Sequence, residues 1–125
     1  MKKINNANHP TFREFALSED LNKSIKNMGF SQPTPIQAEA IPVALKGKDI
    51  LGSAQTGSGK TAAFSIPIIE RLKKDNKSMG VVLAPTRELA KQIYEVVSEL
   101  LSYKNKIKIV SLIGGESINA QLGAL

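Results

Sequence analysis

The stretch that decides the fold reads Ala54-Gln55-Thr56-Gly57-Ser58-Gly59-Lys60-Thr61. Its two glycines let the backbone come close to a ligand, and N–H groups that converge on the start of a helix attract an anion. The lysine that follows can reach the β- and γ-phosphates of a nucleotide, and the threonine hydroxyl can join the shell of a Mg²⁺ ion. The stretch therefore predicts a polyphosphate-binding loop.

The segments on either side of this loop support the prediction. An apolar run, 50–54, precedes the loop and a helix-forming run begins at residue 62, which is the strand–loop–helix order typical of phosphate loops. The general pattern has glycine at the first position, where this chain has Ala54. The alternative interpretation is a surface turn rich in glycine and serine.

Composition limits the classes of function. The chain has 125 residues, of which 42% are hydrophobic, and this suffices for one modest core. A net charge of +6 favours a polyanionic partner, and the absence of cysteine excludes a disulfide framework, a thiolate nucleophile and a Cys-ligated zinc site. No apolar run is long enough to span a bilayer, so we expect a soluble protein without a membrane partner. The lack of cysteine favours a cytoplasmic location.

The chain is expected to begin with a polar arm, followed by a helix. Residues 1–10 have no apolar segment, and we predict that they are disordered. Ser18 can cap a helix whose apolar stripe includes Leu21 and Ile25, and Gly29 stands at the position where such a helix ends.

A second helix is predicted to start at Thr34. Thr34 and Gln37 have the spacing of a capping box, and Pro35 occupies the first helical position. Pro42 should stop or kink this helix, because proline has no N–H to donate to the preceding turn.

Strand and helix patterns alternate through the rest of the chain. Apolar runs predict strands at 50–54, 81–84 and 106–113, and helical spacing predicts helices over 59–72 and 89–101. Alternation of this kind indicates an α/β fold, with a parallel sheet and flanking helices.

One part of a nucleotide hydrolase is missing from the pattern. Such an enzyme needs an acidic residue on a later strand to hold Mg²⁺. The acidic residues after the loop are Glu70, Asp75, Glu88, Glu95, Glu99 and Glu116. None of them follows a buried apolar run, so we expect a truncated chain that binds a nucleotide at most and is inactive alone.

Five separated motifs resemble the opening motifs of the DEAD-box ATP-dependent RNA helicases of superfamily 2. They are Phe12, then Gly29-Phe30-Ser31-Gln32-Pro33-Thr34-Pro35-Ile36-Gln37, then Ala54–Thr61, then Pro85-Thr86-Arg87-Glu88-Leu89-Ala90, then Gly114-Gly115. Alanine is the usual first residue of this family's loop, which accounts for Ala54. The resemblance implies the N-terminal part of a RecA-like P-loop domain over 40–125, preceded by a helical adenine-recognition segment, the Q motif, over 11–39.

The resemblance also implies ATP and Mg²⁺ as cofactors, with Lys60 and Thr61 as the catalytic pair and Thr61 on the metal through ATP. The nucleotide-binding residues implied are Phe12, Gln32, Gln37, Ala54, Gln55, Thr56, Gly57, Ser58, Gly59, Lys60 and Thr61. Gln37 corresponds to the family's adenine-reading glutamine, and Phe12 to an aromatic residue that stacks on the base. The alternatives are that Gln37 completes the capping box with Thr34 and that Phe12 belongs to the core.

The RNA-binding residues that the resemblance implies are Pro85, Thr86, Arg87, Gly114 and Gly115. The alternatives are local: Thr86 caps a helix, Arg87 pairs with Glu88, and the two glycines form a turn. The lysines at 73–77 and 104–108 are interpreted as solvated surface.

The function implied is RNA-stimulated ATP hydrolysis coupled to local unwinding or remodelling of an RNA duplex. The contacts implied are with the RNA backbone, so little sequence preference is expected. The partner domain would be a second, C-terminal RecA-like domain of the same protein. The alternatives are an adenine-nucleotide-binding module without turnover, and another P-loop protein, such as a DNA helicase or a small-molecule kinase, without RNA specificity.

Overall fold

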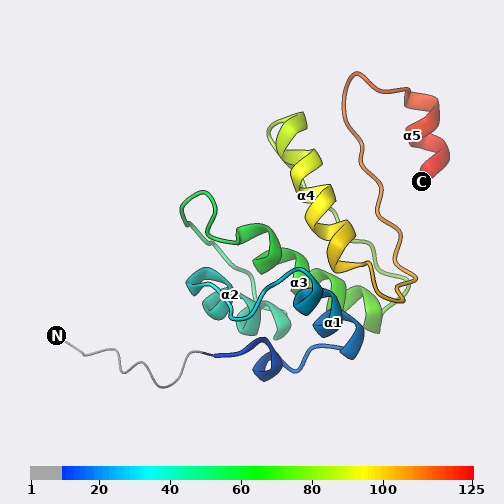
Figure 1. Ribbon diagram of the computed structural model, residues 1–125. Helices are drawn as coiled ribbons and strands as arrows, with labels where there is room; N and C mark the ends of the chain where they lie inside the picture. The colour runs from blue at the N-terminus through cyan, green and yellow to red at the C-terminus, as the bar shows by residue number, and fades with distance from the viewer. Residues whose placement is uncertain (1–9) are drawn as a thin grey trace.

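The computed structural model describes residues 10–125, and the arm predicted over 1–10 lies almost wholly outside them. Figure 1 shows a chain of helices joined by extended segments, with the C-terminus at the last helix. The elements in order are η1 (Phe12–Phe15), α1 (Glu19–Asn27), α2 (Pro35–Leu45), α3 (Lys60–Lys74), α4 (Arg87–Leu100) and α5 (Ile118–Ala124).

The predicted parallel sheet is wrong for the residues that the structure describes, because none of them forms a strand. The segments 50–54, 81–84 and 106–113 are extended but do not pair. Leu51 and Leu83 are 104% and 91% exposed, so no neighbouring layer covers them. A strand needs a ladder of hydrogen bonds to a neighbour, and an apolar run encodes the extended backbone without specifying that neighbour.

The first helix, α1, is confirmed with the predicted stripe. Leu21 and Ile25 are buried, and Gly29 follows the helix with a φ of 78°, a left-handed conformation that favours glycine. Ser18 is the N-cap residue, but its side chain makes no capping bond to α1. Its hydroxyl has a different partner, described below.

The second helix, α2, starts at Pro35 after Thr34 as predicted, but it does not stop at Pro42. It continues through this proline to Leu45, with Ile41 fully buried beside it. The extensive packing of α2 against α3, with Ile41 buried between them, outweighs the one backbone hydrogen bond that Pro42 removes.

The third helix, α3, is the centre of the arrangement and packs against both α2 and α4. It extends from Lys60 through Pro67 to Lys74. The core gathers buried residues from η1, the segment after it and four helices: Phe12, Leu17, Leu21, Ile25, Ile41, Ala62, Ile66, Ile69 and Leu100. The helix that begins at the phosphate loop is therefore held along its length by the core.

The C-terminal part returns along α4. Figure 1 shows the segment after α4 running back beside that helix to α5. Ile107 in this segment packs against the core, and Lys104 adopts a left-handed backbone with a φ of 43°. Within residues 10–125, no helix is both long and apolar enough to cross a membrane.

Candidate functional site

The phosphate loop forms a tight turn between an extended segment and α3. Gly57 and Gly59 have φ values of 80° and 85°, in the left-handed region where other residues are strained. The N–H of Ser58 donates to the carbonyl oxygen of Gln55 across 3.2 Å, which closes the turn. Both glycines are thus required by the backbone path of the loop.

The start of α3 leaves hydrogen-bond donors free for a ligand. Gly59 is the N-cap residue and offers no side chain to the N–H groups of the first turn, which have no acceptor within the helix. The hydroxyl of Ser58 is buried without a hydrogen-bond partner. Donors at a helix N-terminus suit a phosphate group, so the loop fits the polyphosphate that the sequence predicts.

Lys60 and Thr61 open α3 directly after the loop. The Nζ atom of Lys60 donates to the carbonyl oxygen of Ala54, across the loop. Thr61, half-buried in the first turn, carries a hydroxyl of the kind that Mg²⁺ accepts beside phosphate oxygens and water. Both residues therefore lie in the first turn of α3, beside the loop.

Gln37 joins the second helix to the loop. Its side chain is buried, with Oε1 accepting from the N–H of Thr34 at 3.0 Å and Nε2 donating to the carbonyl oxygen of Gly59 at 3.1 Å. The alternative role predicted for Gln37, in a capping box with Thr34, is therefore supported by its hydrogen bond to the start of α2. The second bond, to the loop, is one that the capping box does not require.

The aromatic residue Phe12 lies in the core. Its ring meets that of Phe15 edge to face, with centroids 5.9 Å apart, and stacks on Phe30 with centroids 6.4 Å apart. It also lines a groove between η1, α1 and the turn at Gly29. Gln32, predicted to bind nucleotide, is exposed just beyond that turn.

The residues predicted to bind RNA form a second cluster. The hydroxyl of Thr86 caps α4 by accepting from the N–H of Leu89 at 3.1 Å, while Pro85 before it is exposed. The guanidinium of Arg87 covers the two glycines: a Cβ on Gly114 would lie 3.0 Å from Nη2, and one on Gly115 would lie 2.9 Å from Nη1. Arg87 and Gly114, which are 27 positions apart in the sequence, therefore lie in close contact. The guanidinium can approach the backbone because glycine has no side chain.

Sequence reasoning missed a polar cluster at the other end of α3. Glu70 is 5% exposed and accepts hydrogen bonds from Ser18. The available signal was the position of Glu70 on the apolar face of its helix, next to Ile69 and one turn from Ile66. Lys73, predicted to be solvated surface, belongs to the same cluster.

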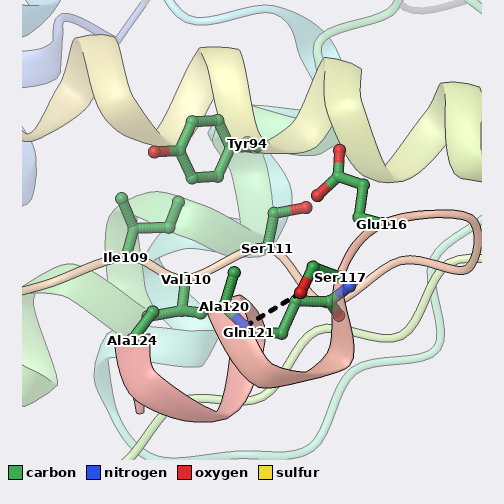
Figure 2. Close-up of a pocket in the computed structure, with 9 residues that line it drawn as sticks. All are labelled: Tyr94, Ile109, Val110, Ser111, Glu116, Ser117, Ala120, Gln121 and Ala124. Atoms are coloured by element: carbon green, nitrogen blue, oxygen red, sulfur yellow. Dashed lines mark hydrogen bonds between the residues drawn. The ribbon is translucent and has the colours of Figure 1, made fainter.

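A further cavity lies between α4, α5 and the extended segment (Figure 2). Tyr94, Ile109, Val110, Ser111, Glu116, Ser117, Ala120, Gln121 and Ala124 line it. The hydroxyl of Ser117 accepts from the N–H of Ala120 at 3.3 Å, and Gln121 ties α5 to the carbonyl oxygen of Ile113 at 2.9 Å. None of the phosphate-loop residues contributes to this cavity.

Residues 34–125 match the DEAD/DEAH box helicase family. The chain is 50% identical over 116 residues to the DEAD-box ATP-dependent RNA helicase CshA of Bacillus cereus, covering 92% of this chain and 22% of that protein. It is 51% identical over 125 residues to a probable ATP-dependent RNA helicase of Dictyostelium discoideum, covering 97% of this chain and 16% of the relative. The chain thus spans about a fifth of the length of these relatives.

A DEAD box protein from the hyperthermophile Methanococcus jannaschii superimposes with a TM-score of 0.85 at 40% identity, covering 92% of this chain and 32% of the other. An RNA helicase from Chaetomium thermophilum bound to ADP gives a TM-score of 0.79 at 39% identity, covering 90% of this chain and 28% of the other.

Proposed function

The chain belongs to the DEAD/DEAH box helicase family, and on that premise we propose that it is the adenine-nucleotide-binding part of an ATP-dependent RNA helicase. The observation that carries the proposal is the bond from Gln37 Nε2 to the carbonyl oxygen of Gly59. It joins the residue expected to read the base to the loop expected to hold the phosphates. A similar protein bound to ADP supports a nucleotide ligand of this class.

The phosphates are proposed to lie at the start of α3. The N–H groups of the first turn would donate to phosphate oxygens, and the ammonium of Lys60 would leave the Ala54 carbonyl for the β- and γ-phosphates. The hydroxyl of Thr61 would complete the shell of Mg²⁺ carried with ATP. These residues bind and orient the triphosphate.

The base is proposed to be selected by Gln37. Its amide has two acceptor lone pairs and two N–H donors, and the protein uses one of each. The remaining lone pair and N–H suit the N6 amino group and N7 atom of adenine, whereas guanine presents the O6 acceptor where adenine has a donor. Gln32 and the groove beside Phe12 would lie against the base.

The cluster at Arg87 is proposed to hold the RNA backbone, together with Pro85, Thr86, Gly114 and Gly115. A guanidinium matches a phosphate with two parallel hydrogen bonds, and the bare N–H groups of two glycines allow close approach. Contacts of this kind position the strand without reading its bases. A cytoplasmic location, and a second RecA-like domain that supplies the rest of the hydrolytic site, are parts of the same proposal.

The test is base discrimination. We expect the full chain to bind ATP at least about tenfold more tightly than GTP, the ratio that corresponds to ~1.4 kcal/mol, and Gln37→Ala to lose most of this preference. Calorimetry or nucleotide competition would measure both constants. Gln92→Ala, which removes an exposed glutamine on α4, is the matched control. Equal binding of ATP and GTP by the unaltered chain would contradict the proposal and favour another kind of P-loop protein.

A further inference from the structure

The carboxylate of Glu70 is buried at the far end of α3 from the phosphate loop. One of its oxygens, Oε1, accepts the N–H of Ser18 at 2.9 Å and the hydroxyl of Ser18 at 2.6 Å. Glu70 and Ser18 are 52 positions apart in the sequence. The pair thus joins two residues that are distant in the sequence. Glu70, which takes part in it, is only 5% exposed, because the packing of the core buries this residue.

Two further charges complete the cluster. The hydroxyl of Ser18 accepts from Nζ of Lys73 at 2.8 Å, and the same Nζ lies 3.7 Å from Oδ2 of Asp20. The Ser18 hydroxyl therefore accepts a hydrogen bond from Lys73 and donates one to Glu70. The four groups form a continuous chain from the first turn of α1 to the last turns of α3.

The cap of α1 is supplied by another helix. The side chain of Ser18 makes no capping bond within α1, and the carboxylate of Glu70 accepts the N–H of Ser18, the N-cap residue itself. A negative charge at the positive end of a helix stabilises that end. The entry of α1 is therefore fixed relative to α3, and not merely packed on it.

The N-terminal segment consequently holds α3 at two points. Gln37 bonds the carbonyl oxygen of Gly59 at the start of the helix, and Ser18 bonds Glu70 about 16 Å further along, at 1.5 Å rise per residue. The core contacts of Phe12, Leu21 and Ile25 hold this segment as well. The two hydrogen-bonded points add directional contacts, one near each end of α3, to the packing of the segment that carries Phe12 and Gln37.

We propose that Glu70 and Ser18 are positioning residues for base recognition. By holding the segment 11–39 in register with α3, they keep the Gln37 amide at the distance from the phosphate loop that an adenine nucleotide spans. Neither residue touches the ligand. This inference rests on the proposed function, because it concerns the same nucleotide site.

The experiment compares two ligands on the full chain: ATP, which uses base and phosphate contacts, and inorganic tripolyphosphate, which uses the phosphate contacts alone. We expect Glu70→Ala to weaken ATP binding about tenfold while tripolyphosphate binding changes less than about twofold. Glu70→Gln keeps an acceptor oxygen for Ser18 and should restore ATP binding to within about threefold of the unaltered chain. Glu95→Ala removes an exposed glutamate on α4 and should change neither constant.

The outcomes separate positioning from stability. Loss of folding weakens both ligands in equal proportion, so parallel losses in Glu70→Ala would overturn the inference. If Glu70→Ala does not fold, Ser18→Ala, which removes only the hydroxyl, is measured in the same way: a loss confined to ATP supports positioning, and an unchanged ratio of the two constants overturns it. An unaltered chain that does not prefer ATP to GTP would overturn the proposed function. A preference that survives Glu70→Ala would overturn this inference alone.

Discussion

Gln37 and Gly59 are in direct contact, although 22 positions separate them: Nε2 of Gln37 donates to the Gly59 carbonyl oxygen at 3.1 Å. A Cβ on Gly59 would collide with that nitrogen. The phosphate-loop pattern explains a glycine at position 59 by the need for the backbone to approach a ligand. The contact with Gln37 gives a second reason, because a larger side chain would not fit there. The residue makes room for a protein side chain as well.

Gly59→Ala should therefore destabilise the chain more than Gly57→Ala. Both positions have left-handed backbones, which costs about 1–2 kcal/mol for alanine, but a Cβ at Gly57 meets nothing within 4 Å. Displacing Gln37 should add about 1–3 kcal/mol to the loss at Gly59, because a buried amide loses its partners. Urea unfolding of the two variants measures the difference, and equal losses would show that the contact is weak.

Lys60→Ala should separate phosphate recognition from base recognition. The ammonium is expected to meet the β- and γ-phosphates and no part of the nucleoside. ATP binding should fall at least about tenfold, the loss expected when one charged hydrogen bond is removed, and adenosine binding should hardly change. Calorimetry with both ligands provides the comparison. Equal losses for ATP and adenosine would place Lys60 away from the phosphates.

The helix starts were readable from the sequence because they depend on neighbours in the chain. Thr34, Pro35 and Gln37 marked α2, and Thr86 marked α4, through bonds that span three residues. The path through Pro42 was not readable, because the burial of Ile41 against another helix decided it. Local chemistry predicts where a helix begins better than where it ends.

The contacts between distant segments could not be predicted from the sequence, because a local pattern does not specify which segment will be its neighbour. An apolar run such as 81–84 encodes an extended backbone but not its neighbour, so the predicted sheet was wrong for the described residues. Ser18 had the residue type of a cap, but its partner, Glu70, lies on another helix. The candidate site residues were predicted from the loop pattern and a family resemblance. The bonds that hold Gln37 and Arg87 in place required the structure.

Gly115→Ala should weaken RNA binding without altering Arg87 itself. Gly115 has a φ of 84°, and a Cβ there would lie 2.9 Å from Nη1 of Arg87, so the guanidinium must move. Arg87→Ala should reduce the salt dependence of single-stranded RNA binding by about 0.7 in log–log slope, the value for one lost phosphate contact, and Gly115→Ala should produce part of that change. Filter binding across salt concentrations measures the slope.

The control for this prediction is Gly123→Ala. A Cβ at Gly123 meets nothing within 4 Å, and its backbone is not left-handed. RNA affinity and slope should remain those of the unaltered chain. A slope unchanged in Arg87→Ala would show that this guanidinium does not contact a phosphate.

Asp75 should titrate below its ordinary range. Hydrogen bonds from the Ser78 hydroxyl and then from the Lys77 N–H stabilise the carboxylate and lower the pKa of Asp75 from 3.8. Because the folded pKa is the lower one, the stabilisation is present above the unfolded pKa and is lost as pH falls through the folded value. Carboxyl NMR shifts report the titration. Ser78→Ala should raise the pKa, and no change would rule out the hydroxyl as its cause.

Ala16→Gly should stabilise the chain. Ala16 is exposed and adopts a left-handed backbone, with φ 54° and ψ 42°, that glycine accepts without strain. The expected gain is about 0.5–1 kcal/mol, since relief of strain exceeds the extra entropy that glycine gives the unfolded chain. Thermal unfolding measures it. Ala120→Gly, inside α5, should have the opposite sign, and a loss in both variants would contradict the assignment of strain at residue 16.

The Lys60 ammonium, the cation of the phosphate loop, donates a hydrogen bond to the Ala54 carbonyl oxygen at the start of the same loop. The triphosphate that we propose at this loop would compete with that carbonyl, so its affinity would be the difference between two interactions and not the full strength of the new one. Binding of the proposed nucleotide would therefore exchange one partner of the Lys60 ammonium for another.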